Sequence, residues 1–190
     1  MKKPNEIIEK KKYKAIVQYI GENEDLDYPS DEFLEKIAPY IGFIVHSFNS
    51  LEQELNSRIC FEICDDCDLM GLNIIYKESF SKKVNLYDRI IRSKQKGLEE
   101  CYPSFQSIIT NLRECSVLRN AVVHADWENM DSEGYTYVKL TLTNEKGWQQ
   151  KYQQFTVKSL ESIDKLIHKT YKELKEFEEE MYSVENKKPE

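Results

Sequence analysis

Arg119, Asn120 and His124 are the residues of this sequence whose types and spacing best support catalytic chemistry. They occur in the segment RNAVVH, which closes a strongly apolar stretch. An imidazole titrates near neutral pH and can serve as general base or acid, whereas a guanidinium stays charged and can stabilise an anionic phosphorane. An asparagine amide can position a phosphate oxygen or fix the histidine. The set suits cleavage of RNA, which carries its own nucleophile in the 2′-hydroxyl group.

The helical repeat decides how these three side chains can meet. On a regular helix Asn120 and His124 lie about 40° apart, and Arg119 lies about 140° from His124. The three residues can therefore border one cleft, but they do not form a compact triad. Such a geometry suits a site that another element or a second subunit completes. Because each chain supplies one histidine to the motif, we expect a homodimer whose two motifs meet across a two-fold axis.

The apolar residues around this segment recur at helical spacing. Few glycines and prolines, with many lysine, glutamate, leucine and isoleucine residues, also favour helices. A first helix is expected over residues 5–20, and a second from about residue 31, which Pro39 should kink or split. The remaining spacings predict helices over residues 39–66, 80–95, 103–124 and 157–182. The helix over 103–124 carries apolar residues in most directions, so we expect it to be central and mostly buried.

After residue 133 the spacing of the apolar residues changes from a helical period to the alternation of a strand. GYTYVKLTLT alternates as a strand does, NEKG is typical of a turn, and WQQKYQQFT suits a returning strand. The predicted fold class is mainly α: a bundle of about five to six helices with a small β-hairpin before the last helix. Residues 1–30 should form an N-terminal helix and an acidic linker, residues 31–182 the helical domain with its hairpin at about 134–156, and residues 183–190 a disordered tail.

Charge is distributed unevenly along the 190 residues. The net charge is −7, which argues against a constitutively tight nucleic-acid binder. Residues 77–98 nevertheless hold seven bases against two acids. This basic stretch is either a solvated face or a surface that follows an RNA backbone. The residues predicted to contact RNA are Lys82, Lys83, Arg89, Arg92 and Lys94.

Glu52 is a carboxylate in the middle of an apolar stripe. On a helical wheel it lies at about 20° from Ile41, inside the arc of the apolar residues. A carboxylate in this position needs a partner. Glu52 either reaches solvent at an interface or orients Arg119, and Asn56, one turn later, is a supporting candidate.

Other site types have weaker support. Cys60, Cys64 and Cys67 share one helix face, but a zinc site would need a fourth ligand, so small buried apolar residues are the better interpretation. No metal or cofactor is expected. The sequence lacks a secretory signal and an apolar run of membrane-spanning length, so we expect a cytoplasmic protein without a membrane partner.

RNAVVH, at the end of the penultimate helix of an all-α bundle, resembles the Arg-x4–6-His motif of the HEPN superfamily. The segment IGFIVHSFNSLEQELN also resembles the early helix of HEPN proteins related to abortive-infection systems, and the resemblance covers about residues 38–180. It implies a four- to five-helix bundle, a homodimer and metal-independent ribonuclease activity. Asp126 stands where one toxin subgroup has a tyrosine, so regulation through that tyrosine is not expected.

Together these observations predict a homodimeric, metal-independent endoribonuclease that leaves a 2′,3′-cyclic phosphate and a 5′-hydroxyl group. The resemblance further implies a toxin or antiphage-defence effector, with an antitoxin or operon-encoded regulator as a possible partner. The alternative is a non-catalytic helical module for dimerisation or for nucleotide or RNA sensing, such as a regulatory partner of a toxin. In that case Arg119 makes an interface salt bridge and His124 caps its helix.

Overall fold

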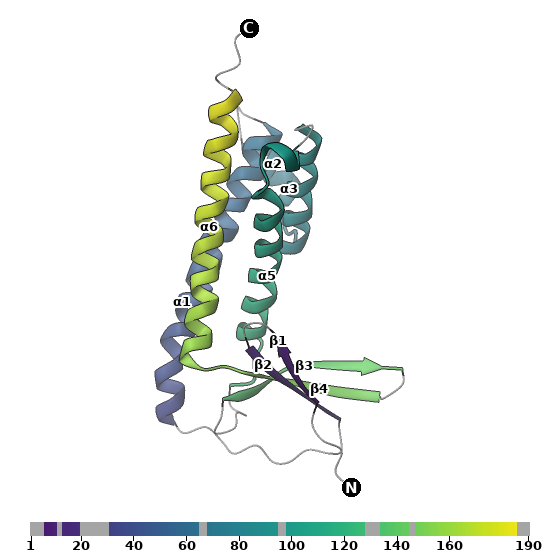
Figure 1. Ribbon diagram of the computed structural model, residues 1–190, viewed down its shortest axis with the longest axis vertical. Helices are drawn as coiled ribbons and strands as arrows, with labels where there is room; N and C mark the ends of the chain where they lie inside the picture. Colours follow the sequence, from purple (N-terminus) through teal and green to yellow (C-terminus); the bar gives the residue numbers. More distant parts are fainter. Residues whose placement is uncertain are drawn as a thin grey trace. The chain divides into compact units, whose positions relative to one another are not determined.

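The computed structural model describes residues 6–10, 13–19, 31–64, 68–94, 98–127, 134–144 and 147–185. Along these ranges the elements are β1 (Glu6–Lys10), β2 (Tyr13–Tyr19), α1 (Asp31–Ile63), α2 (Asp68–Ile75), α3 (Phe80–Lys94), α4 (Leu98–Cys101), α5 (Phe105–Val123), β3 (Tyr135–Thr143), β4 (Gly147–Gln154) and α6 (Val157–Glu185) (Figure 1). The predicted class, a mainly helical protein with a β-hairpin before the last helix, is confirmed. None of the helices in these ranges combines the length and the apolarity needed to cross a bilayer.

The chain divides into two compact units. The sheet unit comprises Met1–Val45 and Leu118–Asp164, and the helical unit comprises His46–Val117 and Lys165–Glu190. Arg119, Asn120 and His124 thus belong to the sheet unit. Glu52, Asn56 and the basic stretch belong to the helical unit.

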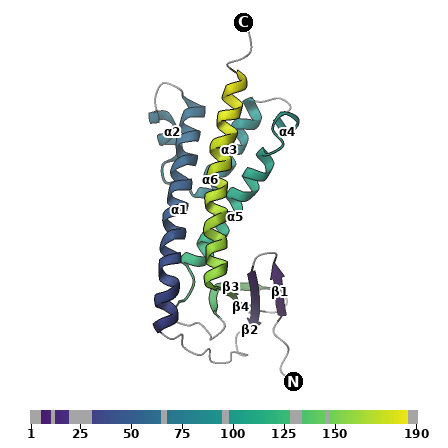
Figure 2. The ribbon, with the colours of Figure 1, turned by 60° about the vertical axis from the view of Figure 1, so that its left-hand side comes forward.

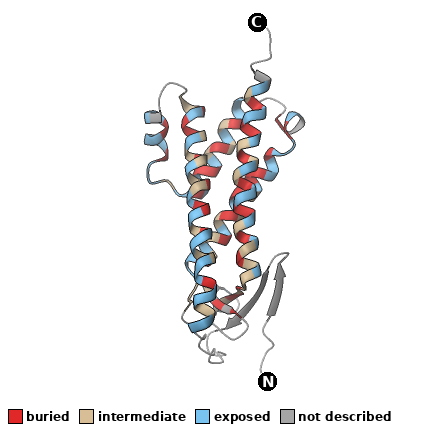
Figure 3. Ribbon diagram, turned by 90° about the vertical axis from the view of Figure 1, so that its left-hand side faces the viewer, coloured by how far each residue is buried: buried red, intermediate tan, exposed pale blue. Residues whose placement is uncertain are grey.

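Apolar faces of α1, α3, α5 and α6 form the core of the helical unit. Figure 2 shows these helices running alongside one another, and Figure 3 shows buried and exposed residues alternating along them. The ring of Phe177 on α6 lies 5.1 Å from that of Phe105 on α5 and 5.6 Å from that of Tyr102. The ring of Tyr87 on α3 lies 6.2 Å from that of Phe105. The aromatic cluster therefore joins three helices that are distant in sequence.

Two helices differ from their predictions. Helix α1 runs unbroken through Pro39, so of the predicted kink or split the split does not occur. Pro39 is exposed, so the carbonyl group that loses its helical donor can bind water instead. Helix α5 is not buried on all sides, because Val117 is 63% exposed and Val123 is 36% exposed. The described residues thus leave an apolar side chain exposed at each of these two positions of α5.

The sheet unit contains one antiparallel sheet with the strand order β1-β2-β4-β3. Strands β3 and β4 form the predicted hairpin, in which Leu142 pairs with Trp148 and the register shifts between Tyr137 and Lys139. Gly147 opens β4 with a φ of 74°, a conformation that glycine adopts without strain.

The prediction of a helix over residues 5–20 is wrong, because this segment contributes the strands β1 and β2. Its β-branched residues favour strands, and β2 gains a full ladder of hydrogen bonds by pairing with β4, with Ile16 opposite Tyr152. The predicted acidic linker lies mostly in residues 20–30, outside the described residues. The last helix extends to Glu185, past its predicted end at 182, and residues 186–190 of the predicted tail also lie outside the described ranges.

Candidate functional site

The predicted catalytic residues lie at the C-terminal end of α5 and in the turn that follows it. Arg119 and Asn120 are in the last turns of the helix, and the Nη1 atom of Arg119 donates a hydrogen bond of 3.0 Å to Oδ1 of Asn120. The backbone N–H of His124 bonds to the carbonyl of Asn120 at 3.0 Å, so His124 continues the helical path by one residue. The structure therefore brings Arg119 and Asn120 into contact and places His124 about one helical turn after Asn120.

The imidazole of His124 is exposed to solvent and makes no hydrogen bond with the described residues. Asn120 is also exposed, whereas Arg119 is half-buried. The sequence predicts a buried helix end, whereas in the single chain the side chains of Asn120 and His124 at this end are exposed to solvent. An open imidazole can exchange protons with a bound substrate, which a histidine engaged in a buried hydrogen bond cannot do freely.

Trp127 fixes the backbone beside His124. Its indole Nε1 donates a 3.0 Å hydrogen bond to the carbonyl of Val122 near the end of α5, which also accepts a 3.4 Å bond from the N–H of Ala125. The Trp127 ring also lies 5.2 Å from the ring of Phe155, which follows β4. The hydroxyl of Thr136 on β3 donates a hydrogen bond to the carbonyl of Asp126. The turn that carries His124 is thus anchored to the hairpin.

Sequence reasoning missed this anchoring role. The available signal was a tryptophan placed three residues after the histidine, just before a predicted hairpin.

A close contact also joins the two ends of the hairpin: a Cβ atom on Gly134 would lie 2.6 Å from the carbonyl oxygen of Phe155. Gly134 has a φ of 86° and accepts a 2.8 Å hydrogen bond from the N–H of Phe155. Any larger residue at this position would push the two ends of the hairpin apart.

In the helical unit, Glu52 has a partner within the chain. Its Oε1 atom accepts a 2.7 Å hydrogen bond from Nζ of Lys83, and the lysine side chain is 10% exposed. The expectation that Glu52 needs a partner is confirmed, and the partner is Lys83. An action of Glu52 on Arg119 stays a prediction. The Oδ1 atom of Asn56 is buried and accepts no hydrogen bond from the described residues.

Most of the predicted RNA-binding cations are held by acids of the same chain. Lys82 lies 2.9 Å from Glu78, Arg92 lies 2.7 Å from Asp88, and Lys94 lies 2.7 Å from Glu62. Arg89, in contrast, is exposed and makes no ion pair with any described residue. Among the five predicted RNA-binding residues, Arg89 is thus the one whose charge no described acid compensates.

A buried polar network in the helical unit was not predicted. Glu178 on α6 is fully buried, and Tyr87 on α3 donates a hydrogen bond to its Oε1 atom. Arg58 on α1 lies 3.6 Å from Oε2. Burial raises the pKa of Glu178 from 4.5 to about 7, although the Tyr87 hydrogen bond and the Arg58 charge oppose the rise. The overlooked signal is a glutamate between Phe177 and Met181 on the apolar stripe of α6.

The described cysteines give no indication of a metal centre. Cys60 is buried and Cys64 is half-buried, whereas Cys67 lies outside the described residues. The part of the chain that the structure describes holds no cluster of three or more histidine, cysteine, aspartate or glutamate side chains suited to a metal ion. Burial of Cys60 agrees with its interpretation as a small apolar residue.

The resemblance to HEPN proteins depends on the motif around Arg119 and His124 and on the segment within α1. No protein-family model, no curated protein and no solved structure matches the chain.

Proposed function

We propose that this protein is a metal-independent endoribonuclease of the HEPN type that acts as a homodimer. The observation that carries the proposal is the exposed, unbonded imidazole of His124 about one helical turn after the Arg119–Asn120 pair. Two further features support it. The hairpin anchors the turn of His124 through Trp127, and α5 exposes Val117 and Val123, apolar side chains that a second copy can cover.

In the proposed reaction His124 of one copy accepts the proton of an RNA 2′-hydroxyl group. The 2′-oxygen then attacks the adjacent phosphorus and forms a phosphorane, whose additional negative charge Arg119 stabilises. The bond from phosphorus to the 5′-oxygen breaks, and the second copy's histidine protonates that oxygen. The products are a 2′,3′-cyclic phosphate and a 5′-hydroxyl group, and Asn120 positions a phosphate oxygen. A role as a toxin or antiphage effector, under an antitoxin or operon-encoded regulator, is part of the same proposal.

The test is cleavage of a labelled RNA by the purified protein in the presence of EDTA. His124→Ala should abolish cleavage while leaving the circular dichroism spectrum unchanged. His168→Ala is the matched control, because His168 is also exposed but lies on α6 in the helical unit. Substitution of 2′-deoxynucleotides at the cleaved position should block the reaction. Undiminished cleavage by the His124 variant would contradict the proposal.

A second function is favoured by the compensated charge of the basic stretch. Since Lys82, Arg92 and Lys94 each lie within 3 Å of an acid of the same chain, the surface available for tight RNA binding is limited. A non-catalytic dimerisation or nucleotide-sensing module would need no more free charge than Arg89 supplies. Dimerisation without cleavage of any RNA tested, in both the wild type and the His124 variant, would select this alternative.

A further inference from the structure

Helix α2 is an apolar helix that exposes most of its side chains. Its only polar residue between positions 69 and 76 is Asn73. The exposed fractions of the apolar side chains on α2 and just after it range from 47% at Ile74 to 71% at Tyr76. The members of this apolar face are Leu69, Met70, Leu72, Ile74 and Tyr76. Contiguous exposed apolar side chains of this kind mark interaction surfaces.

The orientation of α2 is fixed by close packing on its other side. Gly71 and Ile75 are buried, and a Cβ atom on Gly71 would lie only 2.5 Å from the Cα atom of Cys60 on α1. The backbone of α2 therefore lies directly against α1, at a distance that only glycine permits. Because this contact fixes the rotation of the helix, the apolar face stays directed away from α1.

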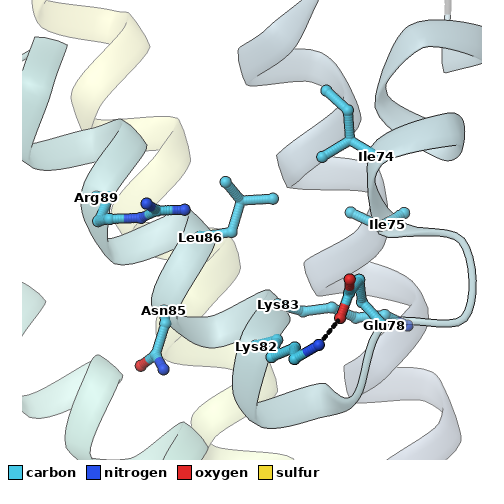
Figure 4. A pocket seen from close by; sticks show the side chains of 8 residues that line it. All are labelled: Ile74, Ile75, Glu78, Lys82, Lys83, Asn85, Leu86 and Arg89. Carbon is cyan, nitrogen blue, oxygen red and sulfur yellow. Dashed lines mark ion pairs between the residues drawn. The ribbon is translucent and has the colours of Figure 1, made fainter.

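A hollow of about 270 Å³ lies between the end of α2 and α3. Figure 4 shows Ile74 and Ile75 on one side, Leu86 and Arg89 on the other, and the Glu78–Lys82 ion pair at one end. Small-molecule sites usually occupy about 300–1,000 Å³, so this hollow is below their usual size. It is large enough for one or two apolar side chains of a docked segment.

The rim of this surface is basic at the end near Tyr76 and the hollow, whereas Asp68 lies at the other end of α2. Lys77 directly follows Tyr76 and is exposed, and Arg89 is exposed without an ion pair to any residue in the described ranges. Glu78 is already compensated by Lys82 at 2.9 Å. An acidic partner therefore finds complementary charge in Lys77 and Arg89 at this end of the surface.

We propose that the apolar face of α2 and the adjoining hollow form a docking surface for an acidic amphipathic helix of another protein. Its apolar side chains cover α2 and enter the hollow, and its carboxylates contact Arg89 and Lys77. A flat lipid bilayer would not fill a concave site that has a carboxylate at its edge. An RNA backbone would leave the apolar face uncovered. The proposal does not depend on catalysis by His124, although it shares Arg89 with the predicted RNA-binding residues.

The experiment uses the full chain and two fluorescent peptides of about 16 residues, each with leucines on one helical face. One peptide carries glutamates on its other face, and the matched peptide carries lysines. Fluorescence anisotropy should show saturable binding of the acidic peptide, at least about tenfold tighter than that of the lysine peptide. Leu72→Asp should weaken acidic-peptide binding by about tenfold or more, and Arg89→Glu should weaken it several-fold at low salt.

Leu142→Asp is the matched control, since Leu142 on β3 is exposed to a similar degree as Leu72. This variant and His124→Ala should both bind the acidic peptide as the wild type does, so that loss of RNA cleavage and loss of docking remain separable. Equal binding of the two peptides, or no effect of Leu72→Asp, would overturn the proposal. So would binding to phosphatidylglycerol vesicles without peptide binding, or a dimer in light scattering that Leu72→Asp dissociates.

Discussion

Tyr87 of α3 donates its hydroxyl hydrogen to Glu178 of α6 inside the core of the helical unit. Both side chains are fully buried, and Arg58 of α1 approaches the other carboxylate oxygen at 3.6 Å. Burial and the nearby carboxylate also raise the pKa of Tyr87 well above its usual value, so the phenol stays the donor. Three helices are thus connected by an acid that is only partly ionised near neutral pH.

The first prediction concerns the pH dependence of folding. The folded pKa of Glu178, about 7, exceeds its unfolded value of 4.5, so the folded state binds this proton more tightly. Its contribution to stability is fully present below pH 4.5 and is lost as the pH rises through 7. The linkage amounts to about 3 kcal/mol. In urea unfolding, the wild type should lose most of this amount of unfolding free energy between pH 5 and pH 8 relative to Glu178→Gln. Glu180→Gln, an exposed change on the same helix, should lose it as the wild type does.

The second prediction concerns the ion pair of Lys83 and Glu52. Lys83→Met leaves a carboxylate in the apolar stripe of α1 without its partner and should lower the free energy of unfolding by about 1–2 kcal/mol. Lys82→Met removes a pair whose lysine is 71% exposed and should change it by less than about 0.5 kcal/mol. In the double variant with Glu52→Leu most of the loss should return. Equal effects of the two lysine variants would contradict the burial argument.

The third prediction concerns Trp127 as a positioning residue. Trp127→Phe keeps a ring against Phe155 but removes the hydrogen bond to Val122, at a cost of about 1 kcal/mol in unfolding free energy. If the turn holds His124 for catalysis, kcat for RNA cleavage should fall while KM stays unchanged. A merely structural role would lower thermal stability and leave kcat intact at temperatures where the variant is folded.

The fourth prediction separates free from paired charge in RNA binding. Arg89→Ala should weaken binding of all RNA sequences and reduce the slope of log K against log salt by about 1. Arg92→Ala should have a smaller effect, because Arg92 is held by Asp88 at 2.7 Å and by Gln106 at 2.6 Å. The rate at saturating RNA should stay the same in both variants. Unchanged slopes for both would show that the basic stretch is a solvated face.

The elements with strong periodicity could be predicted from the sequence, and those defined by distant partners could not. The apolar spacing of α3, α5 and α6 and the alternation of β3 are local signals. The strands β1 and β2 depend on a ladder with β4, more than 100 positions away, that exists only in the folded chain. Local apolar spacing over residues 5–20 therefore suggested a helix.

The candidate site shows the same division between local and distant information. The positions of Arg119, Asn120 and His124 on one helix end followed from spacing alone. The burial of Lys83 could not be predicted from spacing, because its partner Glu52 lies 31 positions earlier in the chain. Helix α2 was missed because an apolar run of eight residues has too few turns to show a helical period.

Strand β3 occupies one edge of the sheet, and an edge strand of this length can recruit further strands into aggregates. The face of the hairpin that carries Leu140, Leu142 and Trp148 is exposed and would favour such growth. The register shift between Tyr137 and Lys139 interrupts the regular spacing of the edge, and the exposed Lys139 places a charge at its centre. An incoming strand would have to bury that ammonium group, so the hairpin resists fibrillar stacking while keeping its apolar surface.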